Sequence, residues 1–113
     1  MSAFQEIVER LQRHHGVNGV MLVGMEDGMV IAGDAGAGRD ADTAAALAAM
    51  IYRKTRIAAE QAGFGAPRFM RLEADGGNVC ATSSGDVMIV AMAARNTNLG
   101  RLRLEMLNAT GAL

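Results

Sequence analysis

The sequence predicts an α+β fold with the element order α-β-β-α-β-β-β-α and one antiparallel five-stranded sheet. Two apolar runs of strand length flank Asp27-Gly28, a pair that favours a tight hairpin with a type I′ turn. An alanine-rich stretch of helical length follows the hairpin, and three further strand-length runs are separated by glycine-containing turns. The chain has 113 residues and shows no linker or internal repeat, so residues 1–113 are expected to form a single domain.

The first helix is expected to begin after Ser2, which forms a capping-box pattern with Gln5, and to end before Gly16. Its apolar residues are spaced i, i+3, i+4 and i+7 and therefore lie on one stripe: Phe4, Ile7, Val8 and Leu11.

The hairpin strands are expected at residues 17–25 and 29–33. In the first strand, one face carries Val17, Met21, Val23 and Met25, and the other carries Val20 and Leu22. Because both faces are apolar, the sheet is expected to be covered on both sides. The loop at residues 34–39 is rich in glycine but lacks the lysine and spacing of a phosphate-binding loop.

Asp40 or Asp42 is expected to cap a long helix that runs to about Ala62, before Gly63. Small alanine side chains surround most of this helix, and strongly polar residues are few. A helix with one buried stripe would carry more polar residues opposite that stripe. We therefore expect its second face to be buried against another surface.

The remaining strands are expected at residues 68–74, 78–83 and 87–93. The first carries charges and is typical of an edge strand, with Phe69 and Arg71 on the face opposite Met70. The last is apolar on both faces and is expected at the centre of the sheet. Asn96 or Asn98 then caps a final helix that ends before Gly111.

Composition argues against several classes of partner. The formal net charge is −1 and aromatic residues make up 4% of the chain, so neither nucleic acid nor an anionic membrane surface is expected to bind. The longest apolar run, residues 87–94, is too short to insert across a membrane as a helix. With no signal-peptide pattern and Cys80 as the only cysteine, a cytoplasmic location is expected.

No set of acid, base, nucleophile or metal-ligating residues converges in the sequence, so we expect no enzyme activity, cofactor or metal. The adjacent His14 and His15 cannot chelate an ion in the i, i+4 manner of zinc sites, and Cys80 is expected to be a buried hydrophobe. Arg53, Lys54 and Arg56 form one basic cluster on the long helix. This cluster is either a solvated face or a docking surface for an acidic or nucleotide-bearing partner.

Three segments resemble the roadblock family, the dynein light-chain roadblock type. They are GVNGVMLVGMEDGMVIA at residues 16–32, Ser84-Gly85-Asp86 before an apolar strand, and NLGRL at residues 98–102. The resemblance covers nearly the whole chain, and it rests on turns and caps, which specify a fold better than an activity.

The resemblance implies the sheet order 2-1-5-4-3, with the long helix on one face and the terminal helices on the other. It also implies a homodimer in which the third strand pairs with its twin to give a ten-stranded sheet, with the two long helices side by side. The expected dimer interface contains Leu47, Met50, Ile57, Phe69 and Arg71.

Prokaryotic proteins similar to this one regulate small Ras-like GTPases, some of them as GTPase-activating proteins. The resemblance thus implies a regulatory module that binds such a GTPase, with partner-binding residues at Arg53, Lys54, Arg56 and Glu60. The alternative is a scaffold or adaptor subunit that leaves nucleotide turnover unchanged. A small-molecule-binding or enzymatic domain ranks third, because no residue motif supports it.

Overall fold

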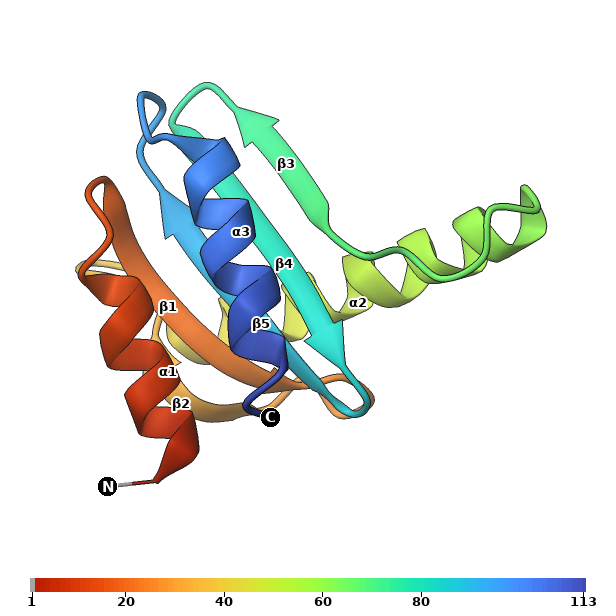
Figure 1. Cartoon of the computed structure of the whole chain (residues 1–113), viewed down its shortest axis with the longest axis horizontal. Helices are drawn as coiled ribbons and strands as arrows, with labels where there is room; N and C mark the ends of the chain where they lie inside the picture. The colour runs from red at the N-terminus through yellow and green to blue at the C-terminus, as the bar shows by residue number, and fades with distance from the viewer. Residues whose placement is uncertain (1) are drawn as a thin grey trace.

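A computed structural model describes residues 2–113 as one antiparallel sheet with helices on both faces (Figure 1). The strands follow the order β2-β1-β5-β4-β3, which confirms the order expected from the resemblance. The strands are β1 (Val17–Gly24), β2 (Val30–Asp34), β3 (Met70–Ala74), β4 (Gly77–Ser84) and β5 (Val87–Ala93). The helices α1 (Ala3–Gln12) and α3 (Leu99–Thr110) cover one face, and α2 (Ala41–Gln61) crosses the other.

Two hydrophobic cores lie on opposite sides of the sheet. The first contains Leu11 of α1 and Leu102 of α3 packed against β1, β4 and β5. The second places Tyr52 and the buried alanines of α2 against the other face of the same strands. Successive side chains of a strand point to opposite faces, so an all-apolar central strand such as β5 supplies both cores. Coverage on both sides, as the sequence predicts, is confirmed.

Side-chain caps fix the starts of the helices. The Ser2 hydroxyl accepts the backbone N–H of Gln5, Asp40 caps α2 and Asn98 caps α3. The pKa of Asp40 lies below its ordinary value, chiefly because the carboxylate accepts the backbone N–H of Thr43 and then because it accepts the Thr43 hydroxyl. Its contribution to stability is therefore present above the ordinary carboxyl pKa and is lost as the pH falls through the lowered one.

The hairpin turn is longer than the sequence predicts. A type I′ turn is wrong here, because it needs positive φ at both central residues. Gly28 has a φ of 68°, but no non-glycine residue in the described part of the chain has a positive φ, Asp27 included. The connection instead spans residues 25–29. The Asp27 carboxylate accepts the N–H of Met29 at 3.0 Å, and Gly28 N–H donates to the Gly24 carbonyl, so a side chain supplies part of the turn's hydrogen bonding.

Val17 lies on the opposite face from the one that strict alternation predicts. It packs with the α1–α3 core, whereas Met21 and Val23 belong to the α2 core. The register between β1 and β5 shifts between Val17 and Gly19. An extra residue in one strand reverses the alternation beyond it, and this irregularity could not be read from the apolar pattern.

Two parts of the structure, the edge of β3 and the end of α2, are not covered by the rest of the chain. The strand β3 pairs only with β4, so it is an edge of the sheet, as predicted. In Figure 1 the C-terminal half of α2 and the connection to β3 extend beyond this edge. The side chains of Ile57 and Phe64, which lie in this extension, are 58% and 85% exposed. Within residues 2–113, no helix is both long and apolar enough to cross a bilayer.

Candidate functional site: the outer face of α2 and the edge strand

The face of α2 that points away from the sheet is unusually apolar. Leu47, Met50, Lys54 and Ile57 follow the spacing i, i+3, i+7 and i+10, so they share one side of the helix, opposite Ala45 and Ala49. We call these four residues the outer stripe. Leu47 is 50% exposed and Met50 is 39% exposed. The stripe holds three of the five residues expected at a dimer interface.

An apolar groove joins the outer stripe to the edge strand. The groove has a volume of about 200 Å³ and lies between α2 and β3, with Leu47, Ile51 and Leu72 among its lining residues. We call it the β3 groove. Leu72 is 40% exposed at the free edge. The strand edge and the outer stripe are therefore parts of one continuous apolar surface.

The other two residues expected at the dimer interface, Phe69 directly before β3 and Arg71 within it, lie on the opposite face of the sheet. Phe69 packs against the α1–α3 core of its own chain, and the Arg103 guanidinium lies 5.7 Å from the centre of its ring. Arg71 forms an ion pair with Glu73. The five expected interface residues therefore lie on both faces of the sheet near the β3 edge, and Phe69 also packs inside its own subunit.

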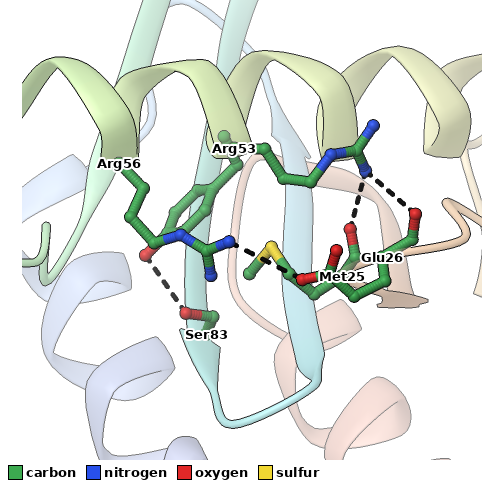
Figure 2. Close-up of polar contacts among 6 residues, drawn as sticks. Met25, Glu26, Arg53, Arg56 and Ser83 are labelled. Atoms are coloured by element: carbon green, nitrogen blue, oxygen red, sulfur yellow. Dashed lines mark hydrogen bonds and ion pairs between the residues drawn. The ribbon is translucent and has the colours of Figure 1, made fainter.

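The basic cluster of α2 is divided by the fold, because two of its arginines bind the β1–β2 connection (Figure 2). The Arg53 guanidinium donates to the Met25 carbonyl at 2.7 Å and to the Glu26 carbonyl at 3.4 Å. Arg56 forms an ion pair with the Glu26 carboxylate at 3.6 Å. Lys54 lies on the outer stripe, and both Lys54 and Glu60 are exposed. Of the four predicted partner-binding residues, Lys54 and Glu60 are therefore the ones presented to solvent.

Replacing Arg53 by glutamine is expected to lower the free energy of unfolding by about 1–2 kcal/mol, because two backbone carbonyls lose a charged donor. Urea unfolding followed by circular dichroism measures the change. The exposed neighbour provides the control: Lys54→Gln should shift the free energy by less than about 0.5 kcal/mol. Equal effects of the two variants would show that Arg53 does not secure the connection.

Tyr52 is a positioning residue that the sequence pattern does not reveal. Its side chain is 1% exposed. The hydroxyl donates to the Pro67 carbonyl at 3.3 Å and accepts from the Ser83 hydroxyl at 3.3 Å. Thr82 adds a bond to the Arg68 carbonyl at 2.8 Å. These bonds fix the segment that leads into β3, and the one available signal was a single tyrosine in an alanine-rich helix.

The thiol of Cys80 is buried and unreactive in character. Its side chain is fully buried in the α1–α3 core. Burial raises the pKa of the thiol above its ordinary value, and the positive charge of Arg71 counteracts only part of this rise. Because the thiolate is the reactive form, this environment disfavours nucleophilic chemistry. Across residues 2–113, no three His, Cys, Asp or Glu side chains gather in a way that could hold a metal ion.

Comparison with known proteins finds a family match and several similar structures. Residues 3–94 match the family model described as the Roadblock/LC7 domain. The sequence is 27% identical over 103 residues to an uncharacterized protein of Methanocaldococcus jannaschii, covering 91% of this chain and 90% of the relative. The structure is similar to a Roadblock/LC7 domain from Streptomyces avermitilis, with a TM-score of 0.85, 24% identity, and 98% and 94% of the two chains covered. It is also similar to Myxococcus xanthus MglB, with a TM-score of 0.87, 23% identity, and 99% and 92% covered.

Proposed function

The chain belongs to the Roadblock/LC7 domain family, and we propose that it is a homodimeric regulatory module that binds a small Ras-like GTPase. It acts in this proposal without a catalytic group of its own. The observation that carries the proposal is the continuous apolar surface formed by the outer stripe and the β3 groove. Such a surface on a small domain is typical of an interface with another protein.

The outer stripe supports self-association through paired α2 helices. Its spacing of three and four residues is the one that lets two helices pack side by side. Alanines flank the stripe, and small side chains allow a close approach of the two backbones. A second copy would remove Leu47, Met50 and Ile57 from water.

The edge strand supports the same symmetry. In an antiparallel pair of two β3 strands related by a two-fold axis at Leu72, Arg71 would stand opposite the partner's Glu73. Opposite charges placed directly across a strand pair are favourable. The pairing would also satisfy the free backbone groups of the edge and join the two sheets into one of ten strands.

The exposed polar residues of α2 are the proposed contacts for the GTPase. Glu60 is exposed and lies outside the outer stripe, so it stays free to meet a partner that approaches the paired helices, whereas Lys54, also exposed in the subunit, belongs to the stripe that the helix pair would cover. Arg53 already donates to two carbonyls and Arg56 is paired with Glu26. The family resemblance implies activation by reshaping of the GTPase's own active site, without an inserted arginine, and the contacts that already engage Arg53 and Arg56 support this part of the proposal.

The proposal predicts that the purified protein co-elutes with its cognate Ras-like GTPase in size-exclusion chromatography when the GTPase carries a GTP analogue. Absence of association in both the GTP-analogue and the GDP state would contradict it. GTP hydrolysis with and without this protein then separates the two functional classes. A faster rate supports an activator, whereas an unchanged rate with intact binding identifies the scaffold or adaptor.

A matched pair of variants locates the contact. Glu60→Lys on α2 is expected to weaken GTPase binding, because it reverses a charge on the proposed surface. Glu9→Lys makes the same change on α1, at the opposite face of the sheet, and should leave binding intact. Sedimentation of both variants checks that the oligomeric state is unchanged.

A further inference from the structure

The face opposite α2 carries a polar cleft that the proposed function does not use. The helices α1 and α3 run in opposite directions over this face, so the end of α1 lies near the start of α3 (Figure 1). Between these ends is a cleft of about 610 Å³. Arg10 lines it from the last turn of α1, Arg13 from the C-cap directly after this helix, and Arg101 from the first turn of α3.

The cleft has an excess of positive charge, although the whole chain has a formal net charge of −1. Three arginines line it, and Glu105 is the one acidic residue that does. Glu105 pairs with Arg101 at 3.5 Å, but the Arg101 side chain is 73% exposed, so this pair contributes little. Among residues 2–113, Arg10 and Arg13 have no acidic partner. Their guanidinium groups remain available to an anion.

The start of α3 adds backbone donors to the same cleft. The Asn98 side chain lines the cleft and accepts the N–H of Arg101. The earlier N–H groups of the helix, at Leu99 and Gly100, have no acceptor within the helix. A Cβ placed on Gly100 would meet only the Asn98 side-chain oxygen, at 3.7 Å, so the backbone there is open to approach. Helix starts of this kind favour phosphate groups.

Two buried polar atoms beside the cleft have no hydrogen-bond partner. One is Nε2 of His14, a residue that lines the cleft. The other is the hydroxyl of Thr97, which is 8% exposed; Thr97 does not itself line the cleft, and its hydroxyl lies against Gly16. Most buried polar groups in proteins are paired. The hydrogen-bonding capacity at this end of the molecule is therefore not satisfied by the chain itself.

We propose that this cleft binds a small molecule that carries a diphosphate group. Its volume lies in the range of small-ligand sites, about 300–1,000 Å³. Arginine forks match phosphate oxygens in pairs, and three arginines against one glutamate suit a ligand with more than one negative charge. Apart from the small rings of His14 and His15, the lining residues include no Phe, Tyr or Trp, the larger rings on which the bases of a nucleic acid strand stack. The site is independent of the proposed GTPase contact on α2.

Isothermal titration of the whole protein at low ionic strength, first with inorganic pyrophosphate and then with ADP, tests the proposal. Both probes are expected to bind. Arg13→Gln and Arg101→Gln should each weaken binding of pyrophosphate about tenfold or more, because each removes a charged hydrogen-bond donor. Arg68→Gln removes an exposed arginine outside the cleft and should leave the affinity unchanged. Thermal unfolding of each variant confirms that it is folded.

The outcomes are distinct. Equal affinities for the two probes would mean that the diphosphate alone is recognised, and tighter binding of ADP would add a contact with the nucleoside; both support the proposal. Failure of both probes to bind at millimolar concentration would overturn it. So would unchanged affinity in both cleft variants, or an equal loss of affinity in Arg68→Gln.

Discussion

Replacing Ile57 by aspartate is expected to convert the proposed dimer into monomers. Ile57 is 58% exposed in the isolated subunit and lies on the outer stripe, where a second copy would bury it. Burying such a side chain is worth about 1.5–3 kcal/mol, and a two-fold interface contains it twice. The dimer Kd should therefore rise at least about a hundredfold, more if the new carboxylate has no partner. Sedimentation equilibrium over a range of protein concentrations measures this change.

The matched control is Leu104→Asp on α3. Leu104 is 59% exposed, close to the value for Ile57, but it lies on the opposite face of the sheet. This variant should remain dimeric. An Ile57→Asp protein that sediments as an intact dimer would show that the outer stripe is not the interface. A wild-type protein that stays monomeric at high concentration, with α2 fully solvated, would remove the basis for the dimer itself.

A charged residue at Phe69 is also expected to weaken the dimer, but it gives a less direct test. Phe69 packs against the α1–α3 core of its own chain. A charge there would lower the free energy of unfolding of the subunit as well as the affinity between subunits. Ile57 makes the two effects separable, since its side chain is outside both cores of the subunit.

Replacing Gly33 by alanine is expected to lower the free energy of unfolding by about 2–4 kcal/mol. Gly33 has a φ of 83°, in the region that side chains other than hydrogen rarely adopt. An added Cβ would also overlap the Val20 carbonyl oxygen on the neighbouring strand, which is backbone and cannot turn away. Urea unfolding at one fixed protein concentration measures the loss, because the proposed dimerisation would make the apparent stability depend on concentration.

Gly38→Ala separates the two causes. Gly38 has a φ of 77°, but an added Cβ would meet nothing within 4 Å. This variant should carry the backbone strain alone, about 1 kcal/mol or slightly more. If Gly33→Ala were no more destabilised than Gly38→Ala, close contact between β2 and β1 would not be what requires glycine at position 33.

Local chemistry explains why most elements could be predicted. The apolar stripe of α1, the edge character of β3 and the central position of β5 each follow from the residues of one segment. The choice between Asp40 and Asp42, or between Asn96 and Asn98, could not be made in this way. Both members of each pair have a capping side chain, and only the position where the chain enters the helix selects one.

The candidate site, too, could be predicted from the sequence only in part. An alanine-rich helix with too few polar residues predicted a second buried face; the outer stripe is the exposed apolar face of α2 in the subunit, and the proposed dimer would bury it. The pattern did not show that Arg53 donates to Met25, 28 positions earlier in the chain. Nor did it show that Tyr52 joins Pro67 to Ser83. Each of these contacts needs two segments that the fold alone brings together.

The sequence by itself determined the order of helices and strands, the two apolar faces of the sheet and the turns that carry glycine. These depend on hydrophobic period and backbone preference, which are properties of neighbouring residues. Only the tertiary structure decided which arginines of α2 bind other parts of the chain and that Val17 packs on the α1–α3 face of the sheet. It also decided that α1 and α3 border a basic cleft. Those outcomes depend on register and on the meeting of distant segments, and no local pattern encodes either of them.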